Sequence, residues 1–245
     1  MTELAGWDLG SFTDGGTTYP TYRRGSGPGV VVIHEIPGIT PLVKGFAEEV
    51  VDSGFTVVMP SLTGTPGEAT TLLNTLSSLR TVCVSREFAT LASGQTSRIA
   101  VWLRALAKQL HGELGGPGVG ALGMCFSGGF ALAMMVEEHT VAPVLSQPSL
   151  PFPVGRKLAA DVNLSPEDLA AVKARTDCPV LGLRYTGDKA VGTRFDTLRA
   201  ELGDRFRAVE FEGRKHSVVT MHRQDSAVEA VLAFFHERLD QSTER

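Results

Sequence analysis

The sequence has few cysteines, no excess of positive charge and no long apolar run. Its three cysteines stand at wide spacings, which suits neither a disulfide framework nor a CxxC metal site. The net charge of -4 and the lack of a Lys- and Arg-rich run argue against nucleic acid as a partner. The N-terminus lacks the basic and apolar regions of a signal peptide, and no stretch approaches the roughly 20 apolar residues that span a bilayer. We therefore expect a cytoplasmic protein that enters no membrane.

The size and composition of the chain favour one globular domain. It has 245 residues, of which 42% are apolar and 20% are charged, a balance that allows one sizeable core to be buried. No internal repeat or low-complexity segment divides it. We expect a single domain over residues 1–245, as a monomer or a small homo-oligomer, between which the sequence does not decide.

Strand and helix patterns alternate along most of the chain. A hairpin is predicted from strands at 8–12 and 17–23, followed by a β-branched core strand at 30–34. Further strands are predicted at 55–59, 119–122, 179–185 and 206–211, and helices near 42–51, 99–110, 128–138, 165–175, 193–202 and 224–239. The stretches 61–98 and 143–163 are predicted to be long loops that shape a pocket. The alternation predicts an α/β fold, with a mainly parallel sheet, helices on both faces and an N-terminal antiparallel hairpin.

The most informative run lies where a predicted strand meets a predicted helix at Cys125. A nucleophile on such a sharp turn needs small residues two positions before and after it, so that the backbones can pass closely. Gly123 and Ser127 meet this need. The turn places the sulfur at a helix N-terminus, where the helix dipole favours thiolate over thiol. Cys125 is therefore the candidate nucleophile.

Three other interpretations of this run carry less weight. Ser127 could be the nucleophile, but Cys125 would then occupy a position that prefers a smaller residue. The glycines of 118–123 match the dinucleotide-binding pattern GxGxxG, but the polar, Gly-rich stretch before them is no strand, so they are expected inside the strand itself. Cys125 could also be an inert buried thiol. That interpretation is adopted for Cys83 and Cys178.

An acid and a base follow the candidate nucleophile in the order that α/β-hydrolases use. Asp188 follows the predicted strand at 179–185, and His216 follows the strand at 206–211. Both come at the carboxyl ends of their strands, where open α/β sheets place their sites. His216 would accept the thiol proton and Asp188 would fix its tautomer. His222 is a weaker rival base, whereas three other histidines are expected at the surface near helix ends, namely His111, His139 and His236.

These residues make the chain similar to the dienelactone hydrolase family of carboxymethylenebutenolidases. The resemblance covers most of the chain and rests on four runs, IHEIPGI at 33–39, GMCFSGG at 123–129, GD at 187–188 and KHS at 215–217. It implies an α/β-hydrolase that cleaves a small lactone or ester through an acyl-enzyme on Cys125, without metal or cofactor. Cysteine at the elbow is its sharpest point, because serine is usual in the wider superfamily.

The resemblance also assigns residues around the triad. The family's glutamate at the position of Glu35 contacts the resting thiol and accepts its proton when substrate binds, although an exposed loop acid is the plain alternative. A carboxylate in a desolvated cleft could do this work. The backbone N–H groups of Ile36 and Phe126 would form the oxyanion hole.

The chain departs from the family pattern in ways that leave the substrate open. Ser127 stands where glycine is usual, and no arginine closely follows His216. In the family an arginine after the catalytic histidine and another upstream of the elbow bind a substrate carboxylate. The candidates for the upstream arginine are Arg86, which is preferred, Arg80 and Arg98. The other functions considered are a non-hydrolytic step such as cyclisation, isomerisation or acyl transfer, and ligand binding without catalysis.

Overall fold

Helices and strands alternate along the chain after an initial pair of strands. The computed structural model describes residues 2–84, 94–149 and 155–240. Its strands are β1 (Asp8–Asp14), β2 (Thr17–Arg24), β3 (Gly29–Ile33), β4 (Thr56–Pro60), β5 (Val119–Met124), β6 (Thr140–Ser146), β7 (Val180–Tyr185) and β8 (Phe206–Phe211). Its helices are α1 (Pro41–Asp52), α2 (Leu72–Val84), α3 (Arg98–Leu114), α4 (Gly128–Met134), α5 (Gly155–Ala160), α6 (Pro166–Ala174), α7 (Arg194–Leu202) and α8 (Asp225–Leu239).

All the strands of the described residues join one sheet, in the order β1-β2-β4-β3-β5-β6-β7-β8. β2 pairs antiparallel with both β1 and β4, whereas β3 to β8 pair in parallel with their neighbours. Crossovers of this kind require a helix between successive strands. The predicted mainly parallel sheet with an N-terminal antiparallel hairpin is confirmed, and the protein has the α/β-hydrolase fold.

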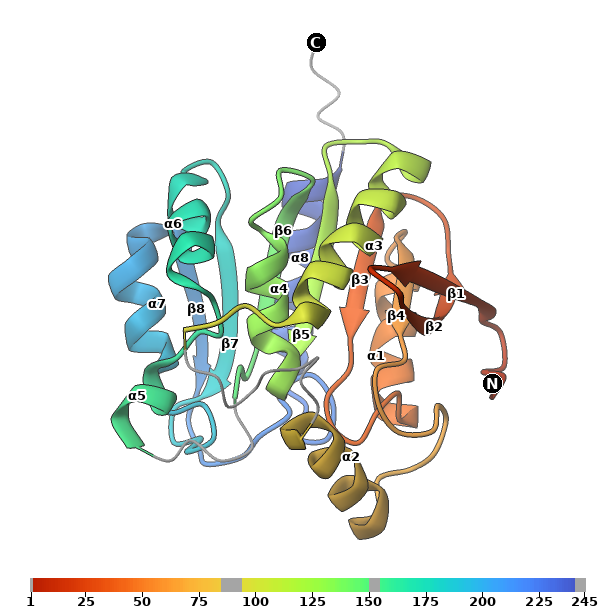
Figure 1. Ribbon diagram of the computed structural model, residues 1–245, viewed down its shortest axis with the longest axis horizontal. Helices are drawn as coiled ribbons and strands as arrows, with labels where there is room; N and C mark the ends of the chain where they lie inside the picture. Colours follow the sequence, from red (N-terminus) through yellow and green to blue (C-terminus); the bar gives the residue numbers. More distant parts are fainter. Residues whose placement is uncertain (1, 85–93, 150–154, 241–245) are drawn as a thin grey trace.

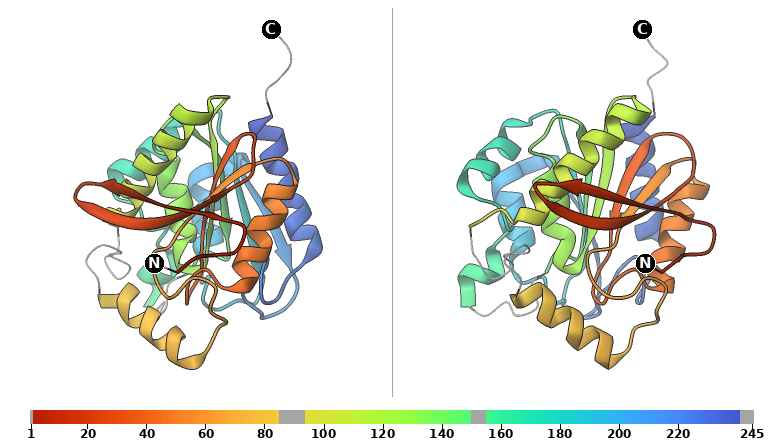
Figure 2. Two further views of the ribbon diagram at one scale, coloured as in Figure 1. Left: turned by 90° about the vertical axis from the view of Figure 1, so that its right-hand side faces the viewer. Right: turned by 45° about the vertical axis from the view of Figure 1, so that its right-hand side comes forward.

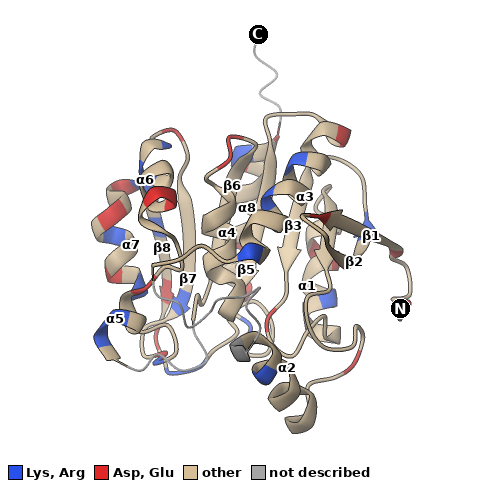
Figure 3. Ribbon diagram, in the orientation of Figure 1, with Lys and Arg blue, Asp and Glu red and all other residues tan. Residues whose placement is uncertain are grey.

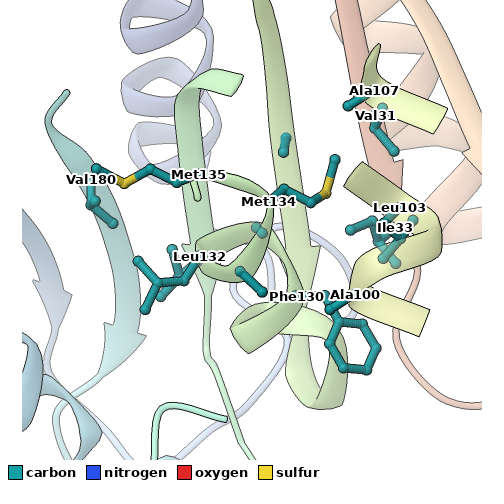
Figure 4. Close-up of a cluster of buried hydrophobic side chains, with 14 of the residues drawn as sticks. Val31, Ile33, Ala100, Leu103, Ala107, Phe130, Leu132, Met134, Met135 and Val180 are labelled. Carbon is teal, nitrogen blue, oxygen red and sulfur yellow. The ribbon is translucent and has the colours of Figure 1, made fainter. Parts of the chain in front are cut away.

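Helices cover both faces of the sheet, so each face carries its own apolar core. α3, α4, α6 and α7 lie on one face, and α1 and α8 on the other (Figure 1). β3 serves both cores, because Val31 and Ile33 face the first and Val30 and Val32 the second. Figure 4 shows side chains of α4 between α3 and β7 within the first core. Burial on both faces explains the β-branched run in the sequence, because each such side chain contributes roughly 1.5–3 kcal/mol when removed from water.

Two stretches predicted to be loops contain regular structure. The stretch 61–98 includes α2, which the pattern did not reveal because Leu72, Leu73 and Leu76 of this helix are exposed. The stretch 143–163 includes the second half of β6 and the short α5. Pro143 concealed β6, because proline is normally excluded from a central strand. The helix predicted at 128–138 is correct in kind but ends at Met134.

Charged residues of both signs are mixed over the described elements, as along α7, whose sequence is RFDTLRAEL (Figure 3). Within the described parts of the chain, no helix has the length and apolar character needed to cross a membrane.

The parallel strands end at one edge of the sheet, and the loops that follow them carry the predicted site. β3, β5, β7 and β8 lead to Glu35, Cys125, Asp188 and His216 respectively. α2 lies beyond this edge in all three views (Figures 1 and 2). It is attached there by Ser78, whose hydroxyl donates to the backbone carbonyl of Pro37 at 2.8 Å.

Candidate active site

Cys125 occupies a strained turn between β5 and α4. Its φ of +56° lies in the left-handed region, which residues with a Cβ seldom adopt. A Cβ built at Gly123 would lie 2.1 Å from the carbonyl oxygen of Ser127, so a glycine is required where the backbones pass. The sharp turn leaves the Cys125 side chain half-buried at the carboxyl edge of the sheet. This is the geometry of a nucleophile elbow.

Ser127, the competing nucleophile, is fully buried and fastens the elbow to the end of β3. Its hydroxyl accepts a hydrogen bond from the Met124 N–H at 2.8 Å and lies 3.0 and 3.1 Å from the carbonyl oxygens of Ile33 and His34, to which it can donate. A hydroxyl enclosed in this way has no access to a substrate, which disfavours the serine alternative. Gly120 and Gly123 lie inside β5, so the GxGxxG pattern does not form a phosphate-binding loop.

Replacing Gly123 by alanine should disable the elbow. We expect Gly123→Ala to lower the free energy of unfolding by about 3 kcal/mol or more, because the added methyl group collides with backbone rather than with a flexible side chain. Urea denaturation measures this loss. The matched control is Gly45→Ala in α1, where an added Cβ has nothing within 4 Å. It should stabilise the protein by roughly 0.5–1 kcal/mol. Equal stability of the two variants would contradict the proposed constraint.

His216 and Asp188 form a hydrogen-bonded pair beside the elbow. His216 Nδ1 lies 2.5 Å from Asp188 Oδ2, and Asp188 Oδ1 accepts the Ala190 N–H at 3.0 Å. Asp188 is buried, so its carboxylate is held in one orientation. Cys125 is the second side chain that stabilises the protonated imidazole, since its sulfur raises the pKa of His216. The three residues therefore make a chain of contacts from carboxylate to sulfur.

The charges of this group favour a protonated imidazole. Burial alone would lower the pKa of His216, but its hydrogen bonds with Asp188 and with the Cys125 sulfur outweigh burial and raise that pKa to about 10. An imidazolium next to the sulfur is the setting in which a cysteine reacts as its thiolate. The arrangement can thus supply a nucleophile and hold the proton that it releases.

Glu35 lies in the same cluster, but its neighbours differ from those that the resemblance implies. The carboxylate is buried and accepts hydrogen bonds from Ser217 at 2.7 Å, Thr220 at 2.5 Å and Gln147 at 3.2 Å. It is not an exposed loop acid. A hydrogen bond between Glu35 and Cys125 is not among those of the described residues, and its role as a proton acceptor stays a prediction.

Comparison with known proteins agrees with this geometry. A sequence model of the "Dienelactone hydrolase family" matches residues 17–239. The chain belongs to the dienelactone hydrolase family. Together with the esterases among its structural neighbours, this membership supports a hydrolase with the α/β-hydrolase fold. A comparison with curated protein sequences gives no significant match.

Three solved structures of low sequence identity have a fold similar to that of this dienelactone hydrolase family member. A dienelactone hydrolase from Anabaena variabilis ATCC 29413 is 18% identical, with a TM-score of 0.67 over 95% of this chain and 98% of that one. A putative dienelactone hydrolase from Klebsiella pneumoniae subsp. pneumoniae MGH 78578 is 17% identical, with a TM-score of 0.65 over 95% and 98%. A cold-adapted esterase from an Arctic intertidal metagenomic library is 17% identical, with a TM-score of 0.65 over 98% and 100%.

Two residues beside the elbow of this dienelactone hydrolase family member were missed by the sequence analysis. Ser149 donates from its hydroxyl to the Cys125 sulfur at 3.2 Å. His34 is fully buried, with Nδ1 2.8 Å from the Glu35 carbonyl oxygen and Nε2 accepting the Leu62 N–H at 3.0 Å. Burial lowers the pKa of His34 to about 4, so it is a neutral residue that fixes the loop after β3. A histidine directly after an apolar strand was the available signal for His34.

The oxyanion-hole residues follow from the positions of their backbones. Phe126 is the residue after Cys125 in the buried turn, as the assignment requires. Ile36 follows Glu35 in the loop after β3, and the Ser127 hydroxyl connects that strand end to the elbow. Both N–H donors remain predictions, because their role depends on where a substrate carbonyl binds.

Of the three arginines considered as ligands for a substrate carboxylate, Arg80 and Arg98 fall within the described residues. Arg86 lies outside the described residues. Arg80 is exposed on α2, and Arg98 lines a groove of about 280 Å³ between the β1–β2 hairpin and α3. A different arginine, Arg194, is fully buried and interacts electrostatically with Cys125. Its terminal nitrogens donate to the backbone carbonyls of Val191 and Leu158, so Arg194 is a fixed charge rather than a free substrate clamp.

The other histidines have partners other than the side chains of Cys125, His216 and Asp188. His222 Nδ1 lies 2.7 Å from the backbone carbonyl oxygen of His216, so it supports the loop of the candidate base. The expectation that His139 lies at the surface is wrong. It is buried against His111, with the two rings stacked at 6.3 Å, and burial lowers its pKa.

Proposed function

We propose that the protein hydrolyses small lactones or esters through a covalent acyl-enzyme on Cys125. The observation that carries the proposal is the continuous contact from Asp188 through His216 to a cysteine on a strained elbow. Membership of the dienelactone hydrolase family supports the same chemistry. In this proposal Cys125 is the nucleophile, His216 transfers the proton and Asp188 orients His216.

Before substrate binds, the proton of Cys125 resides on Nε2 of His216, so the sulfur is a thiolate paired with an imidazolium. The sulfur lone pair attacks the ester carbonyl carbon, and the carbonyl π electrons move to oxygen, where the N–H groups of Ile36 and Phe126 stabilise the negative charge. Collapse of this intermediate re-forms the carbonyl and breaks the bond to the alkoxy oxygen. That oxygen takes the proton from His216. A thioester on Cys125 and the alcohol, or the alcohol end of an opened lactone, result.

Water completes the cycle by the same groups in reverse. His216, now neutral at Nε2, removes a proton from water as the oxygen attacks the thioester carbonyl. The thiolate leaves, and the product is a carboxylic acid. Asp188 keeps Nδ1 protonated throughout, so that Nε2 is always the nitrogen that exchanges the proton.

The experiment that tests the proposal measures both the products released and the covalent modification of the protein. Activated aryl acetates, an unsubstituted γ-lactone and an open-chain hydroxyacyl thioester are each incubated with the protein in ¹⁸O-labelled water. We expect a rapid burst of phenol, an acetyl mass adduct on the peptide that contains Cys125, and label in the carboxylate product. Lactone formed from an open-chain thioester, with no labelled acid, would point instead to cyclisation. A protein that binds these compounds without an adduct or a product would contradict the proposal.

A further inference from the structure

Ser149 contacts the nucleophile at two points. It follows β6 at the carboxyl edge of the sheet and is buried. Its hydroxyl donates to the Cys125 sulfur at 3.2 Å, and its backbone N–H donates to the Cys125 carbonyl oxygen at 3.0 Å. The backbone contact fixes the serine relative to the elbow. The hydroxyl is therefore in place before any substrate arrives.

The segment that carries Ser149 is pressed against the elbow. A Cβ built at Gly128 would lie 2.7 Å from Pro148, so the two backbones approach as closely as a glycine allows. Gln147, just before, is fully buried with a positive φ of 35°, and its side chain is held by the Val218 N–H and the Ser146 hydroxyl. These restraints hold the backbone of Ser149 beside the elbow, where its hydroxyl reaches the sulfur.

The sulfur and the Glu35 carboxylate have separate sets of partners. The hydroxyls of Ser217 and Thr220 and the amide of Gln147 donate to Glu35. The sulfur interacts with Ser149 and His216, and electrostatically with the buried Arg194, whose charge also favours the thiolate. A hydrogen bond to a charged acceptor is stronger than one to a neutral acceptor, so a hydroxyl donor on sulfur favours the thiolate.

We propose that Ser149 is a further catalytic residue, whose hydroxyl stabilises the Cys125 thiolate once His216 holds the proton. This inference rests on the proposed function of Cys125 as the nucleophile. The thiol proton moves from sulfur to Nε2 of His216, and Ser149 keeps its own proton and donates it only as a hydrogen bond. When the sulfur lone pair forms the bond to carbon, the charge leaves sulfur and this hydrogen bond weakens. Glu35 then positions the loop of His216 through Ser217 and accepts no proton from the thiol.

The inference is tested by alkylation of Cys125 with iodoacetamide across pH, without any ester present. The rate is followed on the peptide that contains Cys125 by mass spectrometry, so the other cysteines do not interfere. We expect Ser149→Ala to move the midpoint of the pH profile upward by about one unit, because the thiolate loses a charge-assisted donor. Ser149→Thr keeps a hydroxyl and should return the midpoint toward that of the unchanged protein. Near-ultraviolet circular dichroism verifies that each variant is folded.

Glu35→Gln separates this inference from a role of Glu35 in holding the thiol proton before substrate binds. If Ser149 and His216 hold the thiolate, Glu35→Gln should cause no upward shift of the midpoint. An upward shift in Glu35→Gln, with none in Ser149→Ala, would overturn the inference and assign the proton to Glu35. An unchanged midpoint in Ser149→Ala with normal ester hydrolysis rejects only the inference. A shifted midpoint in a protein that hydrolyses no ester supports the inference but rejects the proposed function.

Discussion

Cys125→Ala is expected to lower kcat/KM for activated aryl esters by about 10⁴-fold or more, with the acetyl adduct lost entirely. The methyl group of alanine cannot attack a carbonyl. The remaining rate comes from direct attack by water, which the proposed oxyanion-hole donors still assist. The backbone strain at this position is unchanged, because alanine also has a Cβ. Steady-state kinetics and intact-protein mass spectrometry measure the two effects.

Cys178→Ala is the control for this substitution. Cys178 is fully buried, and burial raises the pKa of its thiol, so it is suited to packing rather than to chemistry. We expect its replacement to leave kcat/KM within about a factor of two, since the sulfur lies far from solvent. If Cys125→Ala retained a comparable rate while Cys178→Ala lost it, the assignment of the nucleophile would be wrong.

Asp188→Asn is expected to reduce kcat/KM by roughly 10⁴-fold while the fold is kept. Asparagine has nearly the same shape, but its amide can donate to Nδ1 and so favours the tautomer that leaves Nε2 protonated. The substitution also removes the hydrogen bond and the negative charge that raise the pKa of His216. Imidazolium is populated below its pKa. Lowering that pKa therefore moves the alkaline limb of the kcat/KM profile to lower pH.

The control for this change is Asp196→Asn on α7. The side chain of Asp196 is 69% exposed, so the same chemical change is made in solvent. Its rate and its pH profile should match those of the unchanged protein. An Asp188→Asn variant with an unaltered alkaline limb would show that Asp188 does not set the protonation of His216.

The elbow and the positions of the three candidate catalytic residues could be predicted from the sequence because they depend on local rules. Gly123 must be a glycine because its backbone passes close to that of Ser127, only four residues later. A requirement between residues so near in sequence can be recognised from a short motif. The positions of Asp188 and His216 follow from where β7 and β8 end, since parallel strands bring their carboxyl ends to one edge. Knowledge of the fold class was therefore sufficient to place Asp188 and His216 at the same edge of the sheet.

The surroundings of the sulfur were not accessible, because they depend on contacts between distant segments. Ser149 reaches Cys125 because β6 lies beside β5 in the sheet. Strand β6 was not predicted from the sequence, because it contains Pro143 and proline is rare in central strands. Two of the three donors to Glu35, Ser217 and Thr220, come from the segment after β8, about 180 residues further along the chain. The buried charge of Arg194 gave no signal either, since an arginine in the first turn of an ordinary helix is expected in solvent.

The hydroxyl of Ser127 has a mechanical consequence for this protein. It joins the turn that carries Phe126 to the end of the strand that leads to Ile36, two segments more than 90 residues apart in sequence. The spacing between the two proposed oxyanion donors is thus set inside the packed interior, where displacement is costly. This spacing does not depend on the loops beyond the sheet edge, because the contacts of the Ser127 hydroxyl lie within the elbow and at the end of β3. Ser127 thus has a structural role beside the proposed oxyanion hole, although its own hydroxyl is enclosed by the backbone.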